Sequence, residues 1–199
     1  MRTALKAFLN KVVGTPKMQK LGREPHEIET QNVVCTADLK QEVKIGSFNR
    51  YKHLSSNLDL YRCGYVKDHT MVGRVTVFKN GKMISVGTKS PNQAKRELRK
   101  TCKILQEYKL ARPVRITPQI RNIVSRFDLK KILPIETLAR TLPRCIYEPE
   151  QFPGLIYRIQ GSCVALIFAS GKGVIVGAKS IEETNSALFE VQLHIQHAS

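Results

Sequence analysis

Cysteine and histidine are the residues of this chain that could support covalent or metal chemistry, and their spacing favours neither. The five cysteines form no Cys-x-x-Cys pair, so they indicate neither a zinc site nor a disulfide framework and suit a reducing compartment. Cys145 or Cys163 could act as a nucleophile beside a histidine, but no nucleophile motif surrounds either residue. His194 and His197 have the spacing of metal ligands but lie near the end of the sequence. The sequence therefore predicts no enzymatic activity, no metal and no cofactor.

Lysine and arginine give the chain a second kind of chemistry, the attraction of polyanions. They number 33 against 16 acidic residues, a formal charge of +17, and residues 31–120 hold 18 basic against 6 acidic residues. Such an excess creates a strong attractive potential for nucleic acid. Because no apolar run approaches the roughly 18 residues that a spanning helix needs, we expect no membrane partner.

Five basic residues fall together on one predicted helix. They are Lys95, Arg96, Arg99, Lys100 and Lys103. Their spacing fits a solvated helix face, and a binding surface for a protein partner is the rival interpretation.

Residues 1–27 are interpreted as a basic N-terminal extension. The opening MRTALKAFLNKVVG is basic and amphipathic, which also fits a transit peptide or a membrane-surface helix. Residues 15–30 lose that periodicity and are typical of a tether, so an extension is the favoured interpretation.

An internal repeat with an offset of 90 residues must position these groups. The matching segments are Asn32-Val33-Val34 with Asn122-Ile123-Val124, Asp38-Leu39 with Asp128-Leu129, Phe78 with Phe168, Gly81-Lys82 with Gly171-Lys172, and Gly87-Thr88-Lys89-Ser90 with Gly177-Ala178-Lys179-Ser180. Two copies far longer than the roughly 20–50 residues of solenoid repeats predict two halves related by approximate two-fold symmetry. We expect the first repeat at residues 28–112 and the second at 113–199.

Each copy is predicted to run from a strand to a short helix, then through several strands to a long helix. In the second copy we expect strands at 120–129, 155–159, 164–169 and 174–177 and a short helix at 134–142. A capping box should open the long helix at Ser90 and at Ser180. The helix residues predicted to face the sheet are Ala94, Leu98, Cys102, Leu105, Ala187, Val191 and Ile195.

One face of the predicted sheet has apolar residues that no helix is available to cover. Residues two apart in a strand share a face, which groups Asn32, Val34, Thr76, Phe78, Ile84, Val86, Asn122, Val124, Leu166, Phe168, Val174 and Val176. Their neighbours Val75, Val77, Ala165 and Ile167 should face the helices. An open apolar face flanked by cations suits the DNA minor groove, which is recognised through shape and inserted wedges. A β-sandwich core, a dimer interface and a lipid-binding helix-grip or hot-dog-like sheet are the alternatives.

Several second-repeat segments resemble the TATA-box-binding protein family. They are Tyr147-Glu148-Pro149-Glu150-Gln151-Phe152-Pro153-Gly154-Leu155-Ile156-Tyr157-Arg158-Ile159, Ala165-Leu166-Ile167-Phe168-Ala169-Ser170-Gly171-Lys172 and Gly177-Ala178-Lys179-Ser180. The resemblance covers about residues 28–196, closely in the second repeat and remotely in the first. It implies an α+β fold, a pseudo-two-fold saddle of two repeats with a ten-stranded curved antiparallel sheet and helices on the convex face.

The resemblance also implies a function and residue roles. It implies a general transcription initiation factor that binds double-stranded promoter DNA in the minor groove and bends it. The implied wedges are Tyr61, Phe78, Phe152 and Phe168, the central asparagines are Asn32 and Asn122, and the implied phosphate contacts are Lys67, Lys82, Arg158 and Lys172. Glu148 and Glu150 match a contact with a transcription factor IIB-type partner, and the basic helix resembles a surface for a transcription factor IIA-type or repressor partner. A homodimer in the absence of DNA is a further possibility that the resemblance implies.

Three departures from the family pattern bear on specificity. Val86 and Val176 stand where threonines are expected, and the segment 57–61 ends in Tyr61 where the pattern has phenylalanine. A tyrosine wedge would bring a hydroxyl to a dry base step. The alternative function is therefore a paralogue with relaxed DNA specificity that acts on other promoters or as a repressor. The basic extension favours a nuclear, eukaryotic protein, and the compartment is cytoplasm or nucleoid if the chain is archaeal.

Overall fold

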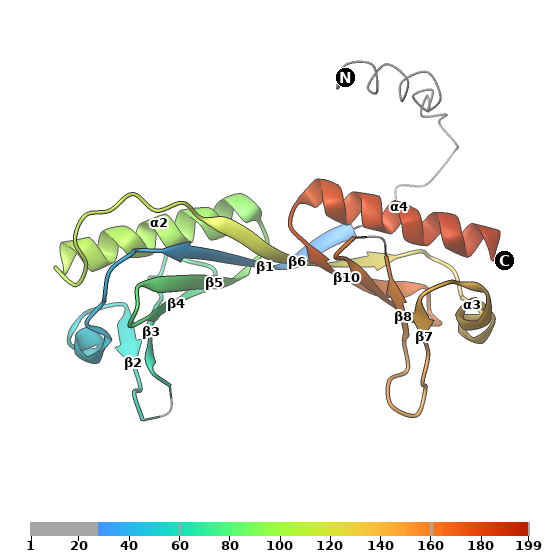
Figure 1. Ribbon diagram of the computed structural model, residues 1–199, viewed down its shortest axis with the longest axis horizontal. Helices are drawn as coiled ribbons and strands as arrows, with labels where there is room; N and C mark the ends of the chain where they lie inside the picture. The colour runs from blue at the N-terminus through green and yellow to red at the C-terminus, as the bar shows by residue number, and fades with distance from the viewer. Residues whose placement is uncertain (1–27, 60, 160, 199) are drawn as a thin grey trace, which may run out of the picture.

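A single ten-stranded antiparallel sheet forms the body of the protein, shown in Figure 1. The computed structural model describes residues 28–59, 61–159 and 161–198. The first half comprises β1 (Ile28–Asp38), the 3-10 helix η1 (Ile45–Arg50), β2 (Leu54–Ser56), β3 (Cys63–Val66), β4 (Arg74–Phe78), β5 (Lys82–Thr88) and α2 (Pro91–Glu107). The second half comprises β6 (Gln119–Asp128), α3 (Ile135–Thr141), β7 (Cys145–Ile146), β8 (Leu155–Arg158), β9 (Val164–Ile167), β10 (Lys172–Ala178) and α4 (Ile181–His197).

The strand order makes the two halves symmetric about the centre of the sheet. It runs β2-β3-β4-β5-β1-β6-β10-β9-β8-β7, so the first strand of each half pairs with its counterpart. In this central pair Asn32 lies opposite Val124 and Val34 lies opposite Asn122. Figure 1 shows α2 and α4 along one side of the curved sheet, with the β2–β3 and β7–β8 connections hanging from the other. The predicted α+β saddle is confirmed.

Alternation along the strands sends one set of side chains toward the helices. Val75, Val77, Ala165 and Ile167 are fully buried, as predicted. The helix residues predicted to meet the sheet are buried in both α2 and α4. No described helix is long and apolar enough to cross a lipid bilayer.

Only one of the two long helices makes the N-cap hydrogen bond of the predicted capping box, and its carboxylate binds the amide before the N-cap instead of the N-cap amide. The Ser180 hydroxyl accepts a hydrogen bond of 3.1 Å from the Glu183 amide, and the Glu183 carboxylate accepts one of 2.6 Å from the Lys179 amide. The Ser90 side chain makes no capping hydrogen bond, so the capping box predicted there is wrong. Pro91 occupies the first turn instead, where its fixed φ suits a helix start.

The buried polar atoms that lack a hydrogen bond lie in the first half of the described chain. Four buried polar atoms of the first half make no hydrogen bond among the described residues; they belong to Ser85, Thr88, Glu97 and Thr101. The repeat offset relates these positions to Ile175, Ala178, Ala187 and Val191, which are all buried. Since a buried polar group without a partner costs stability, these four atoms lower the stability of the first half.

Candidate nucleic-acid interface

Two asparagines lie at the centre of the open face in matching environments. The Oδ1 atom of Asn32 accepts a 2.8 Å hydrogen bond from the Gly87 amide, and that of Asn122 accepts one of 2.8 Å from the Gly177 amide. Because a backbone N–H can only donate, each side chain turns its oxygen to the glycine and its NH2 group away from it. The NH2 groups can therefore donate to the acceptor atoms that A·T base pairs display in the minor groove.

The apolar residues of the open face are partly exposed. All eight groove-face positions predicted beside the asparagines share this intermediate burial: Val34, Thr76, Ile84, Val86, Val124, Leu166, Val174 and Val176. The residues between them in each strand lie fully buried under the helices, so only one face is covered. Among the described residues no second sheet packs on the open face, which is inconsistent with a β-sandwich core within this chain.

At the second-repeat end of this face two phenylalanines form a pair. The ring centroids of Phe152 and Phe168 lie 5.8 Å apart at an interplanar angle of 61°. Gly154 makes room for them, since a Cβ there would lie 2.7 Å from Cε1 of Phe152 and 3.1 Å from Cε1 of Phe168. The two predicted wedges of the second repeat are thus brought together.

The first-repeat end differs. Tyr61 is 66% exposed, and no ring contact joins it to Phe78 within residues 28–59 and 61–159. The structure therefore places the two predicted wedges of the first repeat near one end of the sheet without assembling them as a pair.

Sequence reasoning missed four polar residues on the open face: Tyr65, Arg74, Arg121 and Arg126. The guanidinium of Arg74 lies over the Tyr65 ring, 4.6 Å from its centroid. Nε of Arg121 donates a 2.9 Å hydrogen bond to the Thr36 hydroxyl, and Arg126 lies 2.5 Å from the Glu29 carboxylate. The period of two that grouped Thr76 with Phe78 would also have found Arg74, and Asn122 and Val124 would have led to Arg126.

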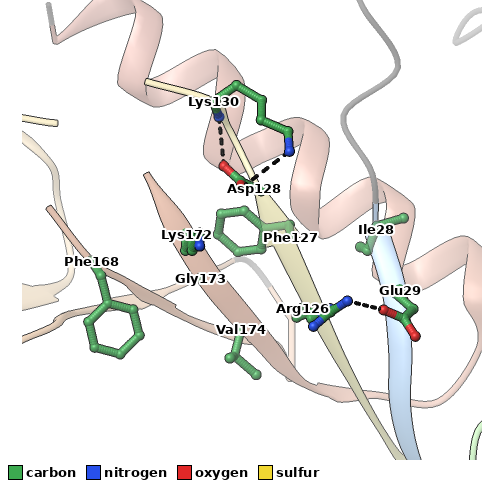
Figure 2. A pocket seen from close by; sticks show the side chains of 10 residues that line it. All are labelled: Ile28, Glu29, Arg126, Phe127, Asp128, Lys130, Phe168, Lys172, Gly173 and Val174. Atoms are coloured by element: carbon green, nitrogen blue, oxygen red, sulfur yellow. Dashed lines mark hydrogen bonds and ion pairs between the residues drawn. The ribbon is translucent and has the colours of Figure 1, made fainter. Parts of the chain in front are cut away.

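Two hollows beside the phenylalanines are related by the repeat. The hollow in Figure 2, of about 740 Å³, lies between Phe168 and Glu29, and its lining includes Arg126, Lys130 and Lys172. Its counterpart, of about 630 Å³, lies beside Phe78. The Lys89 ammonium, hydrogen-bonded at 3.1 Å, holds the pKa of the Glu29 carboxyl below its usual range.

The predicted phosphate contacts form two pairs related by the repeat. Lys82 and Lys172 begin β5 and β10. Lys67 directly follows β3, and Arg158 is the last residue of β8. The amide of Lys67 donates to the His53 carbonyl at 3.0 Å and that of Arg158 to the Arg144 carbonyl at 3.2 Å. All four side chains are exposed, as phosphate binding requires.

The predicted partner surfaces occupy two different elements. Glu148 and Glu150 are exposed in the β7–β8 connection, where the Glu148 carbonyl accepts hydrogen bonds of 2.9 Å from the Gln151 and Phe152 amides. On α2, Arg96, Arg99 and Lys103 are exposed and Lys95 is partly so. Lys100 differs, because its ammonium binds the Asp68 carboxylate at 2.7 Å.

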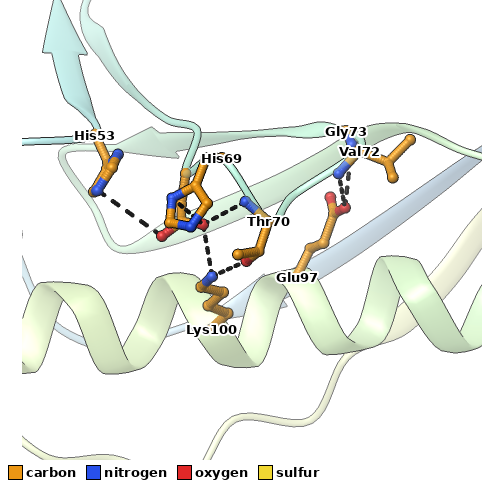
Figure 3. Close-up of polar contacts among 8 residues, drawn as sticks. His53, His69, Thr70, Val72, Gly73, Glu97 and Lys100 are labelled. Atoms are coloured by element: carbon orange, nitrogen blue, oxygen red, sulfur yellow. Dashed lines mark hydrogen bonds and ion pairs between the residues drawn. The ribbon is translucent and has the colours of Figure 1, made fainter.

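Figure 3 shows how polar contacts attach α2 to the β3–β4 connection. The buried Glu97 carboxylate accepts hydrogen bonds from the amides of Val72 at 2.9 Å and Gly73 at 3.1 Å. Asp68 binds the Thr70 amide at 2.6 Å as well as Lys100.

Two histidines approach the same carboxylate, a grouping that the sequence did not suggest. His53 and His69 lie 3.9 Å and 3.6 Å from Asp68. Asp68 is also bound by Lys100 and the Thr70 amide, so these contacts belong to one cluster of polar groups around its carboxylate.

The residues considered for catalysis are occupied in structural contacts. Burial raises the pKa of the Cys145 thiol to about 11 and also raises the pKa of Cys163. Nδ1 of His194 contacts the Tyr157 hydroxyl, and Nδ1 of His197 lies 2.7 Å from the Leu193 carbonyl. A thiol with a raised pKa is a poor nucleophile at neutral pH.

The amino-acid sequence is similar to those of proteins from one known family. The family model described as transcription factor TFIID, or TATA-binding protein, matches residues 27–108 and 117–197. A TATA-box-binding protein of Cenarchaeum symbiosum is 38% identical over 169 residues, covering 84% of this chain and 93% of its own length. That of Sulfolobus acidocaldarius is 40% identical over 166 residues, covering 82% and 84%. A TBP-related factor of Drosophila melanogaster is 34% identical over 167 residues, covering 82% and 74%.

A solved structure agrees with the arrangement of strands and helices. The TBP of Methanococcus jannaschii superimposes with a TM-score of 0.76 at 28% identity, covering 86% of this chain and 99% of that one.

Proposed function

We propose, for a chain that belongs to the TATA-binding protein family, a specific set of residues that carry out the function of that family. The protein is a general transcription initiation factor that binds promoter DNA. Minor-groove binding and bending fit this fold, and the TATA-binding protein is itself a standard example of a protein that kinks the duplex.

The observation that carries the assignment is the uncovered face with two oriented asparagines at its centre. Asn32 and Asn122 each turn an NH2 group away from their glycine partners, and the apolar positions around them are partly exposed. An apolar surface of this kind matches the shape of a widened minor groove. We assign Phe152 and Phe168 as wedges, and Lys67, Lys82, Arg158 and Lys172 as phosphate contacts that make affinity depend on salt.

We assign two partner surfaces to opposite halves. Glu148 and Glu150 would bind a transcription factor IIB-type partner from the second-repeat connection, where both carboxylates are exposed. Lys95, Arg96, Arg99 and Lys103 would bind an acidic surface of a IIA-type or repressor partner. Lys100 is left out of this surface, because its charge is paired with Asp68.

A second candidate function is that of a paralogue with altered DNA preference. Val86 and Val176 supply no hydroxyl beside the asparagines, and Tyr61 is 66% exposed. The two valines would relax recognition at the centre of the face, and Tyr61 would relax it at the first-repeat end. The TATA-box-binding proteins that the chain resembles are mainly archaeal, so we propose cytoplasm or nucleoid as the compartment, and the nucleus for a eukaryotic source.

Selection from random duplexes tests the function. An A·T-rich consensus is expected, with affinity that falls steeply between low and moderate salt because several phosphates are neutralised. Binding to lipid vesicles with little salt dependence, and no selected sequence, would contradict it. A selected consensus without an A·T-rich core would favour the paralogue.

A further inference from the structure

The two ends of the open face carry different chemistry at positions that the strand register makes equivalent. The second-repeat end presents Phe152, Ile156, Val164, Leu166 and Phe168, and the first-repeat end presents Tyr61, Tyr65, Arg74, Thr76 and Phe78 at the same places. One end is wholly apolar. The other has two hydroxyls from tyrosine, one from threonine and a guanidinium.

A steric difference beneath the rings accompanies this change. Cys63 pairs with Phe78 between β3 and β4. In the second repeat Leu155 pairs with Ile167, so the register places Gly154 beside Phe168. Cys63 and Gly154 are therefore equivalent positions. The rings of Phe152 and Phe168 fill the space that a side chain on Gly154 would need. Cys63 has such a side chain, and it is buried. The first repeat therefore has a side chain where the second repeat leaves room for its rings, and Tyr61 is 66% exposed.

The charge around the two ends is also unequal. The hollow beside Phe78 is lined by four cations, Lys40, Lys82, Arg115 and Arg121, and one carboxylate, Asp38. The hollow beside Phe168 is lined by three cations and two carboxylates. One of those carboxylates, Glu29, already binds Arg126 and Lys89. The first-repeat end therefore has the larger excess of positive charge.

We infer that the protein kinks its DNA at one end, the end that Phe152 and Phe168 contact, and holds the other end by charge without inserting a ring pair. This inference rests on the proposed minor-groove function and adds that the two ends of the bound DNA are deformed differently. The kinked step lies under the second repeat, and the first repeat binds phosphates and a narrower groove through Arg74 and its neighbouring cations.

The energetics of base unstacking support an unequal bend. Opening a base step has an energetic cost, which burial of an apolar wedge must offset. The Phe152–Phe168 pair can supply that burial. A tyrosine would bring a hydroxyl into the opened step, where it would lose its hydration. Arginine side chains are favoured in a groove that stays narrow, because the negative potential is strongest there.

Fluorescence of 2-aminopurine tests the inference on the full-length protein. The base analogue is placed at each step of the selected site in turn, because unstacking of the step raises its emission. In the wild-type complex we expect 2-aminopurine emission to rise strongly in one region of the site. That rise should disappear in the Phe152→Ala/Phe168→Ala variant, which assigns the unstacked region to the second repeat. Two regions of equal increase would overturn the inference. Absence of any selected duplex would instead refute the proposed function.

A reciprocal pair of variants tests the steric cause. Cys63→Gly combined with Tyr61→Phe should create a second emitting region, because the thiol no longer takes the space of a ring. Gly154→Cys should weaken the existing one. Circular dichroism identifies a variant that fails to fold. In that case the emission of the other variant tests the steric cause. A folded Gly154→Cys protein with unchanged emission, or a folded double variant that still shows one region, would show that this position does not set the bend.

Discussion

Lys100 of α2 donates a hydrogen bond of 2.7 Å to the Asp68 carboxylate in the β3–β4 connection. This contact, with the Thr70 amide bonded to the same carboxylate, holds the pKa of Asp68 well below its usual range. It couples the attachment of α2 to the protonation state of one side chain.

Acid should therefore weaken the attachment of α2. Asp68 takes up a proton in the unfolded chain near pH 4 but resists it in the folded protein, so the unfolded state binds more protons and stability falls as pH decreases below about 4. Asp68→Asn should show a shallower loss in chemical denaturation between about pH 5 and pH 2. In Lys100→Met the Asp68 carboxyl should titrate at higher pH by NMR, and an unchanged titration would contradict the assigned cause.

The second-repeat phenylalanines should contribute directly to DNA binding. Phe152→Ala and Phe168→Ala should each weaken binding to the selected duplex by about 1–3 kcal/mol, as expected for loss of a stacking side chain. Circular-permutation gel shifts should report a smaller bend. Equal bending by the double variant would count against the wedge assignment.

The orientation of the central asparagines can be tested by a change of one atom. Asn122→Asp keeps an oxygen that can accept from the Gly177 amide but replaces the outward NH2 with an acceptor, which would oppose the acceptors of an A·T pair. We expect a loss of binding of about 1–3 kcal/mol, with unfolding unchanged. Asn32→Asp is the matched test in the first repeat. If either variant bound as the wild type does, the NH2 group would not contact the bases.

The β7–β8 connection should act in recruitment and not in DNA binding. Glu148→Arg should leave affinity for the duplex intact while the IIB-type factor no longer joins the complex. The arginine would repel the basic partner surface that the carboxylate of Glu148 attracts. Glu42→Arg, an exposed reversal in the first half, is the control for net charge. A ternary complex of undiminished affinity with Glu148→Arg would refute the surface.

The buried hydroxyl of Thr101 should cost stability. Thr101→Val installs the residue type found at the matching Val191 and should stabilise the protein by about 1 kcal/mol, because a buried group without a partner is removed. Val191→Thr should destabilise by about 1–3 kcal/mol. Urea denaturation measures both changes. Destabilisation by Thr101→Val would mean that the hydroxyl has a favourable interaction.

Period-two alternation predicted most of the fold because each strand has one face toward a helix. The 90-residue offset then allowed the strands of one repeat to be predicted from the strands of the other. Alternation also separated Val75 and Val77, which are buried, from Thr76, which is partly exposed. Local patterns sufficed here because burial on a strand depends on neighbours two residues apart.

The features that escaped prediction depend on register across strands and on side-chain geometry. Tyr61 corresponds to Phe152 at an offset of 91 residues, while Phe78 corresponds to Phe168 at 90. This difference of one residue hid the equivalence of Cys63 with Gly154. Ser90 and Gln93 have the spacing of a capping box, but the Ser90 side chain makes no cap hydrogen bond, so this spacing alone does not determine the cap.

The β1–β6 pair at the centre of the sheet has a consequence for how this surface can vary. In a dimer of identical halves the same joint would form only above a certain protein concentration, and every substitution would appear at both ends at once. Because one polypeptide contributes both strands, closure of the joint is independent of dilution. Each extremity can then differ from the other, so that a near-symmetric backbone can carry two chemically different ends.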